Sequence, residues 1–385
     1  MKNIWVLFLC VTFLSCDRSV SKVYNYQEYL SKSDFSITLD QESDYNFYFF
    51  EEIELDGSNY LLRLNNANKC IYQYSLEDGQ TVKKICYPSE APTELDFIQG
   101  FTFVNLDSIY LYRRGSLSGI TLINDRSEFL NSFNAIFDSN KTNDKINNHI
   151  SIPKSPTYFH NKKLNFIKYP VFDTRNPDNL NSDFLFSIGV DIDEKTIDYN
   201  EKSTFPENYQ KKIWPVYNLG LSRIFDNINE REIYSWDMLD TIEIRNRNGE
   251  LLDKKFAGSK YSEPNVSLSN KLENKEEINS FVNSSIYYSI KHDPYSNLYY
   301  RFFRIPLGRE LGDIPHYAFP SDGNDFSIIV MDKNFKILNE VVFPGKKYKL
   351  EQAFVSKNGI YLPKTNSFDT NLNEDEVLYD IYKLF

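Results

Sequence analysis

A strand–turn–strand unit recurs along the chain, and this recurrence restricts the possible folds more than any other feature. In each unit an alternating or apolar strand leads into a polar turn rich in Asp, Asn or Gly, and a second strand follows. Five such turns fall near residues 78, 125, 193, 248 and 334. A further strand candidate precedes most of them, at residues 58–65, 107–114, 163–170, 231–237 and 297–306. Small sheets of about four strands, repeated at irregular spacing, are typical of a β-propeller.

The C-terminal region predicts a sixth sheet. Residues 351–364 form a hairpin around Asn358-Gly359, and residues 376–385 supply a third strand. We expect the fourth strand to come from residues 34–40, "DFSITLD", which have no partner nearby in the sequence. Strands from both ends of the chain would then close the ring and remove its exposed edges. The predicted fold class is all-β, a six-bladed β-propeller closed by its N- and C-terminal strands.

Two segments interrupt the β pattern. Residues 269–285 lack Gly and Pro and are rich in Lys, Glu and Leu, which favours a short helix with Asn270 and Glu273 as a capping box. Residues 127–138 carry a phenylalanine at every fourth position, a spacing that fits a helix face and alternate strand positions equally well. We therefore expect one or two short helical insertions in the propeller.

The N-terminus predicts export. Lys2 precedes an almost wholly apolar run at residues 4–14, which is too short to span a bilayer of about 20 helical residues. A charged start, a short apolar core and a small residue are typical of a secretory signal. The small residue is Ser15, and Cys16 follows it in the manner of a bacterial lipobox. We expect Cys16 to be lipidated and to hold the protein on a membrane.

The lipobox match has departures. Phe13 stands where Leu is usual, and Leu14 stands where a small residue is common. An ordinary signal with a coincidental cysteine, and an uncleaved anchor, are the alternatives. The predicted organisation is a signal peptide at residues 1–15, a tether at 16–33 and one propeller domain at 34–385. The expected location is the bacterial cell envelope, with the outer membrane as the first choice.

The charge of the chain argues against one class of partner. The formal net charge is −11 and the pI is near 5.1. Nucleic-acid phosphates need a basic face, so no nucleic-acid partner is expected.

Two cysteines flank one of the five turns. If the turn occupies residues 77–79, Cys70 and Cys86 face each other across the ladder. An exported chain meets an oxidising compartment, where such a pair can close into a disulfide. Two buried thiols, or a ladder register that differs by one residue, are the alternatives.

The sequence contains no recognisable set of catalytic residues, and we predict no catalytic residue, no metal ligand and no cofactor. Arg113 and Arg114 lie at the tip of a strand on an otherwise acidic protein, where they could bind a carboxylate or phosphate. Alternation along residues 297–306 places Tyr299 and Arg301 on one face, and these are the other candidate ligand-binding residues. A solvated turn for the first pair, and guanidinium stacking between blades for the second, are the structural alternatives.

Three segments of the chain resemble segments of a known protein family. They are "FPENYQKKIW", "SSIYYSIKH" and "DPYSNLYYRF", at residues 205–214, 284–292 and 293–302. The chain resembles a family of Bacteroidota lipoproteins described as a domain of unknown function, DUF4221, which is similar to TolB-like six-bladed propellers. The resemblance implies fold and envelope location. It implies no activity, because the family has no catalytic residues to carry over.

The function expected from these observations is binding. The ring would present its loops to a small ligand, a glycan, a peptide or another envelope protein. The alternative is a lactonase-type propeller hydrolase, which would need a divalent ion held near the axis by Glu, Asn and Asp from different blades. The lining of the central channel should discriminate between these two functions.

Overall fold

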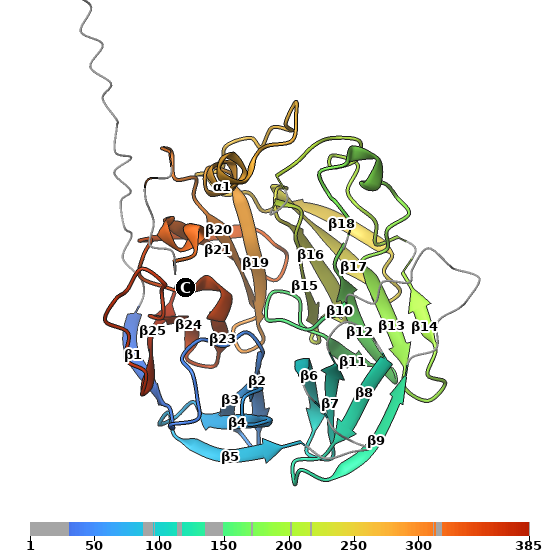
Figure 1. Cartoon of the computed structure of the whole chain (residues 1–385), viewed down its shortest axis with the longest axis vertical. Helices are drawn as coiled ribbons and strands as arrows, with labels where there is room; N and C mark the ends of the chain where they lie inside the picture. Colours follow the sequence, from blue (N-terminus) through green and yellow to red (C-terminus); the bar gives the residue numbers. More distant parts are fainter. Residues whose placement is uncertain are drawn as a thin grey trace, which may run out of the picture.

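The computed structural model describes residues 31–87, 95, 97–113, 118–134, 149–170, 172–200, 202–215, 218–310, 312 and 318–384. Their strands form six antiparallel sheets, and Figure 1 shows these sheets arranged as the blades of a ring. The predicted signal peptide, Cys16, Arg114 and Phe137 lie outside the described residues. No helix in the described part of the chain is long and apolar enough to cross a membrane.

Each blade is numbered here in chain order, with its innermost strand first. Blade one contains β2 (Phe50–Leu55), β3 (Ser58–Asn65), β4 (Cys70–Ser75) and β5 (Thr81–Cys86). Blade two contains β6 (Ile98–Asn105), β7 (Ser108–Arg113), β8 (Ser118–Ile123) and β9 (Phe129–Asn134). Blade three contains β10 (His149–Ile150), β11 (Tyr158–His160), β12 (Lys163–Lys168), β13 (Ser187–Asp191) and β14 (Ile197–Tyr199).

The remaining blades follow the same plan. Blade four contains β15 (Leu221–Asp226), β16 (Arg231–Trp236), β17 (Thr241–Asn246) and β18 (Leu251–Phe256). Blade five contains β19 (Ile286–Asp293), β20 (Leu298–Arg304), β21 (Phe326–Met331) and β22 (Ile337–Phe343). Blade six contains β23 (Phe354–Ser356), β24 (Gly359–Pro363), β25 (Glu376–Lys383) and β1 (Ser31–Thr38).

The five predicted hairpins are confirmed as the outer two strands of blades one to five. Their turns follow β4, β8, β13, β17 and β21. The five preceding candidates are confirmed as the second strands β3, β7, β12, β16 and β20. Local turn chemistry and alternation were sufficient here, because each of these strands pairs with its neighbour in sequence.

The predicted closure of the ring is confirmed. β1 pairs antiparallel with β25 along its whole length, from Ser31 opposite Lys383 to Thr38 opposite Glu376. The strand begins three residues before the expected Asp34 and ends two before the expected Asp40. Three residues assigned to the tether therefore already belong to blade six.

The helix prediction is confirmed in kind, but its cap was misplaced. α1 spans Asn274–Val282, and the capping box joins Glu273 to Glu276. The expected box at Asn270 lies one turn too early, because residues 271–273 have no helical conformation. The ambiguous segment at 127–138 contains strand β9 over Phe129–Asn134, where it pairs with β8.

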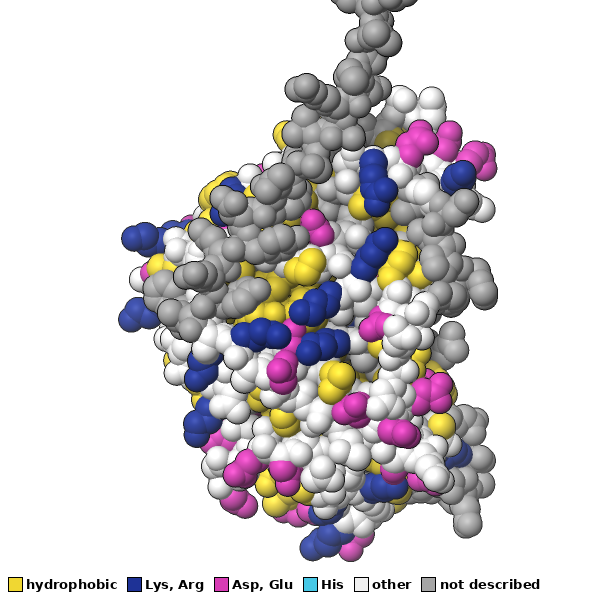
Figure 2. Space-filling view, turned by 90° about the vertical axis from the view of Figure 1, so that its left-hand side faces the viewer, with side chains coloured by type: hydrophobic (Ala, Val, Ile, Leu, Met, Phe, Trp, Pro, Cys, Tyr) yellow, Lys and Arg dark blue, Asp and Glu magenta, His cyan; other side chains and the backbone are white. Residues whose placement is uncertain are grey.

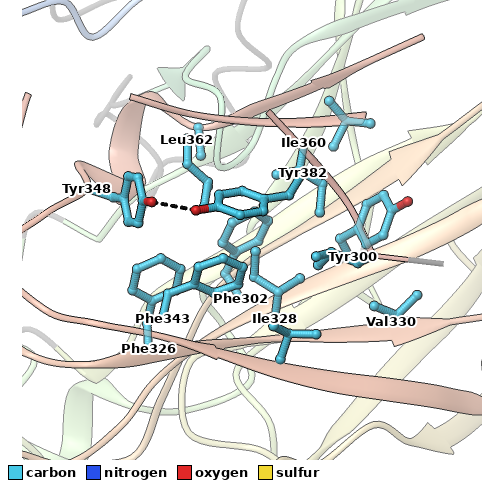
Figure 3. Packing of buried hydrophobic residues seen from close by; sticks show 14 of the residues in the cluster. Tyr300, Phe302, Phe326, Ile328, Val330, Phe343, Tyr348, Ile360, Leu362 and Tyr382 are labelled. Carbon is cyan, nitrogen blue, oxygen red and sulfur yellow. Dashed lines mark hydrogen bonds between the residues drawn. The ribbon is translucent and has the colours of Figure 1, made fainter. Parts of the chain in front are cut away.

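Apolar side chains fill the spaces between neighbouring blades. Figure 3 shows the cluster between blades five and six, where Phe326 and Phe343 stack with ring centroids 5.1 Å apart. The hydroxyl groups of Tyr348 and Tyr382 lie 2.7 Å apart within this cluster. Blades bury both faces by such packing, which is why the array closes into a ring.

A buried carboxylate holds the outer strands of blade six together. Asp380 on β25 is 0% exposed and lies within salt-bridge distance of Lys32, Lys347 and Lys364. Burial by itself would raise the pKa of Asp380, but hydrogen bonds from Lys364, Tyr348 and Lys347 hold it below its usual value. Figure 2 faces this side of the ring and shows Lys and Arg side chains gathered around acidic ones. The cations therefore have a local structural role in blade six.

Candidate functional site in the central channel

The innermost strand of blade three is interrupted, and the interruption shapes the channel. β10 and β11 both pair with β12, and residues 151–157, "SIPKSPT", leave the sheet between them. Pro153 and Pro156 have no backbone N–H and cannot donate to a ladder, which disfavours a continuous strand here. We call residues 151–157 the channel loop, and Figure 1 shows the strands of neighbouring blades around it.

Hydrogen bonds fix the channel loop to three other blades. Ser155 Oγ donates to the carbonyl of Leu221 at 2.8 Å, and Ser222 Oγ donates to the carbonyl of Lys154 at 2.6 Å. Lys291 Nζ on β19 donates to the carbonyl of Pro153 at 3.3 Å. The loop also meets blade two, where Ser151 Oγ donates to Phe101 O at 3.3 Å. The loop is therefore a fixed partition in the channel.

A cavity lies on each side of this partition. The larger cavity has a volume of about 470 Å³ and includes Pro153, Pro156 and Thr157 in its wall. The smaller cavity has a volume of about 100 Å³ and includes Lys154. We call them the aromatic cavity and the polar cavity.

All six blades contribute to the wall of the aromatic cavity. Its aromatic lining consists of Phe50, Phe103, Tyr158, Phe159, Phe225 and Phe354. Tyr158 and Phe225 stack with parallel rings 4.3 Å apart, across the junction of blades three and four. Such flat rings offer contact area to an apolar or aromatic ligand.

The charged lining of the aromatic cavity includes Glu51, Glu52, Lys291 and His292. Glu51 accepts a hydrogen bond from the N–H of Phe103 at 2.9 Å, and burial raises the pKa of its carboxyl to about 8. Burial lowers the pKa of the Lys291 ammonium to about 8. Near neutral pH both groups thus carry a proton for most of the time, so one wall offers a neutral acid and a cation.

The other two residues of this set, Glu52 and His292, interact with several neighbouring side chains of the protein. Glu52 accepts from Ser356 Oγ at 2.7 Å and from Asn59 Nδ2 at 3.0 Å, which joins blades one and six. The ring of His292 stacks on Tyr299 at 4.7 Å, and burial lowers the pKa of this histidine. Lys291 and Glu51 each make a single hydrogen bond within the described residues, to Pro153 and from Phe103, so they keep more capacity to meet a ligand.

Arg301 lies between blades and lines neither cavity, which does not fit its predicted role in ligand binding. Its side chain is 0% exposed. Nε donates to Ser235 Oγ at 2.9 Å, Nη1 to the carbonyl of Ala257 at 2.9 Å and Nη2 to the carbonyl of Leu239 at 2.7 Å. The guanidinium also lies 3.7 Å from the ring centroid of Tyr287. The structural alternative, stacking between blades, describes Arg301.

Tyr299 is likewise buried between blades. It is 0% exposed, donates its hydroxyl to the carboxylate of Asp226, and accepts a hydrogen bond from Arg231 at 2.8 Å. The expected alternation is nevertheless correct. Tyr299 packs toward blade four, whereas Tyr300 on the next position packs toward blade six.

The remaining predicted site residues lie elsewhere. Arg113 ends β7, and its Cδ would lie 2.6 Å from a Cβ placed on Gly119, so the side chain runs across the neighbouring strand. It lines neither cavity. Cys70 lies opposite Cys86 in the β4–β5 ladder, and the two are joined by a disulfide. A bulge after Gln73 places Tyr74 opposite Thr81 rather than Val82.

Sequence reasoning overlooked Lys291 and Glu51. Both lie on innermost strands, "IYYSIKHD" and "FEEIEL", which the hairpin pattern does not reach. Neither strand singles out one charged position, because β2 has three glutamates and Lys291 is followed by His292 and Asp293, so the sequence offered no clear signal. Among the residues that the structure describes, no group of three His, Cys, Asp or Glu side chains is arranged to hold a metal ion.

Six small antiparallel sheets around an axial channel, closed by strands from both termini, define a six-bladed β-propeller. The chain belongs to the family described as "Domain of unknown function (DUF4221)", whose model matches residues 14–341. Both the predicted fold class and the predicted family are thereby confirmed.

Two solved structures support the fold. A member of the DUF4221 family from Bacteroides vulgatus ATCC 8482 has a TM-score of 0.77 at 18% identity, covering 92% of this chain and 98% of that chain. The "Putative exported protein (BF0058)" from Bacteroides fragilis NCTC 9343 has a TM-score of 0.52 at 12% identity, covering 92% and 95%. No curated protein sequence matches this chain.

Proposed function

We propose that this protein is an exported, lipid-anchored propeller of the bacterial cell envelope that binds a small anion with an aromatic or apolar body. The observation that carries the proposal is the wall of the aromatic cavity, where six aromatic rings surround Lys291 and Glu51. Rings supply contact area, while a cation and a protonated carboxyl supply direction toward an anionic group. A cavity of about 470 Å³ suits a ligand of metabolite size.

The predicted binding depends on two protons. An anion is favoured when Lys291 is charged and Glu51 is neutral, and both states are lost as pH rises through about 8. At pH 9 each group would be in its protonated, binding-competent state about one tenth of the time. The affinity for the anion should therefore fall about 100-fold from its value at pH 7. The measurement is calorimetric titration of the purified protein with benzoate, whose charge stays constant across this pH range.

Matched probes and variants sharpen this test. The neutral analogue benzamide, which has no group that ionises in this range, should show a much smaller change of affinity with pH. Replacing Lys291 by Met should remove most of the preference for the anion, whereas Lys357→Met, at an exposed turn, should leave it unchanged. Equal affinity of wild type and Lys291→Met for the anion would contradict the proposal.

The hydrolase alternative receives less support from the same cavity. A divalent ion on the axis would need oxygen ligands from different blades. The acidic residues in the described wall are Glu51 and Glu52, neighbours on one strand, and both accept hydrogen bonds from the protein. Turnover of a lactone or ester that EDTA abolishes would overturn the binding proposal in favour of this enzyme.

Export is supported by the sequence of residues 1–16 and by the designation of the Bacteroides fragilis neighbour, whereas lipid anchoring is supported by the position of Cys16 in the sequence alone. Replacing Cys16 by Ala should release the protein from membranes or leave an unprocessed precursor, because the thiol is the site of acylation. Membrane fractionation with immunoblotting measures both outcomes. A normally cleaved Cys16→Ala protein that still sediments with membranes would contradict lipidation.

A further inference from the structure

The wall of the polar cavity contains buried polar atoms that have no hydrogen-bond partner in the described residues. It lies where blades four, five and six meet, on the Lys154 side of the channel loop. Three polar atoms in its wall are buried and have no hydrogen-bond partner in the described residues: Arg304 Nε, Asn324 Oδ1 and Glu351 Oε2. Buried polar atoms are nearly always paired, so three around one cavity point to a polar occupant.

Arg304 and Asn324 are held in place by other atoms of their side chains. Arg304 Nη2 donates to the carbonyl of Phe281, and its guanidinium lies 3.8 Å from that ring's centroid. Asn324 Nδ2 donates to the carbonyls of Val282 and Ile305, both at 2.8 Å. Arg304 and Asn324 are each 3% exposed. The amide oxygen of Asn324 is therefore oriented as an acceptor by two fixed bonds.

The neighbouring charges neutralise one another. Lys154 pairs with Asp237 at 2.7 Å, and Lys349 pairs with Asp322 at 3.1 Å. Among the titratable residues of this wall, one basic and one acidic side chain remain outside these pairs: Arg304 and Glu351. Burial raises the pKa of Glu351, and a ligand ammonium beside it would favour its charged form. A ligand that carries one charge of each sign would complement them.

We propose that the polar cavity binds a small zwitterion of the amino-acid class. Its carboxylate accepts from Arg304 Nε, and its ammonium donates to Glu351 Oε2 and Asn324 Oδ1. A volume of about 100 Å³ would hold several waters, since each needs about 10–15 Å³, and so admits a molecule of about that many heavy atoms. Ile286, Phe326 and Leu350 provide an apolar wall for a short side chain, and Phe326 is visible in Figure 3.

The fold assembles this site from the ends of separate elements. Arg304 is the last residue of β20, and Asn324 follows the short 3₁₀ helix Pro320–Gly323. Glu351 lies in the 3₁₀ helix Leu350–Gln352 that leads into blade six. The inference does not rest on the aromatic cavity, so either proposal can fail alone.

The experiment titrates the full-length protein, purified in mild detergent, with alanine, alaninamide and propionate by calorimetry. Alaninamide lacks the carboxylate and propionate lacks the ammonium. We expect alanine to bind at least about tenfold more tightly than either analogue, because each loses one charge-assisted hydrogen bond. Glycine and serine, which are also small, extend the same series.

A variant of Glu351 distinguishes a role of this residue in ligand recognition from a purely structural role. Glu351→Gln keeps the shape of the side chain but loses the charge, so it should weaken alanine about tenfold and leave propionate unchanged. Glu374→Gln, on an exposed loop, is the matched control. A purely structural Glu351 would instead weaken both probes together with the melting temperature.

Three results would overturn the proposal: no heat with any of the three amino acids at millimolar concentration, equal binding of alanine and alaninamide, or unchanged alanine affinity in Glu351→Gln. A crystal structure of the alanine-soaked protein showing waters alone in the cavity would also reject it.

Discussion

Deleting residues 17–41 should lower the melting temperature by about 10 °C or more, whereas deleting residues 17–30 should leave it almost unchanged. The longer deletion removes β1, which forms the outer edge of blade six through eight paired residues. It also removes Ile37 and Leu39, which are 0% and 6% exposed. Burying two such side chains contributes about 1.5–3 kcal/mol each, before the lost ladder is counted.

The loss extends beyond the strand itself. Phe35 packs on Tyr361 and Tyr379 with centroids 5.6 and 6.0 Å away, and Lys32 lies 3.1 Å from the buried carboxylate of Asp380. Without β1, β25 becomes an open edge on an apolar sheet and should promote aggregation. Differential scanning calorimetry and light scattering measure both effects. Equal melting temperatures for the two deletions would contradict the role of β1 in closing the ring.

Replacing Arg301 by Met should destabilise the protein by about 3 kcal/mol or more. The variant keeps an unbranched, apolar side chain but leaves Ser235 Oγ and the carbonyls of Ala257 and Leu239 without their donor. Each buried acceptor that is left without a donor has a desolvation cost of about 1–3 kcal/mol. Relaxation of the surrounding structure recovers part of this cost. Urea unfolding followed by tryptophan fluorescence measures the change, since Trp236 lies beside these acceptors in blade four.

The control for this variant is Lys357→Met, which alters an exposed residue and should change stability by less than about 0.5 kcal/mol. Binding of benzoate to the folded Arg301→Met protein should remain, because Arg301 does not line the aromatic cavity. Unchanged stability together with lost binding would restore Arg301 as a ligand-binding residue.

The arginine prediction shows the limit of a periodic pattern. Alternation along β20 correctly separated Tyr299 and Arg301 from Tyr300 and Phe302. It could not tell whether the face that carries Arg301 meets solvent, a channel or another blade. In a propeller both faces of a blade are covered, so an arginine there must find its acceptors in a neighbouring sheet.

The missed site residues have a related cause. Lys291 and Glu51 lie on innermost strands that follow long connections between blades, and no short turn marks where these strands start. The channel loop was missed as well, although Pro153 and Pro156 already disfavoured a continuous strand. Whether a strand interrupted in this way projects outward or into the axis depends on contacts with Leu221 and Ser222, which lie more than sixty residues further along the chain.

By itself, the sequence determined the family, the number of blades, the outer hairpins, the pairing of residues 34–38 with the last strand, and the apposition of Cys70 with Cys86. These features depend on turn chemistry, on a side-chain period of two, and on strands at the chain ends that need partners. The tertiary structure alone decided that Arg301 is a packing residue and that Lys291, Glu51, Arg304 and Glu351 surround two cavities. The physical reason is that burial and the identity of a side chain's neighbours across blades arise only when the ring closes, and no local pattern encodes them.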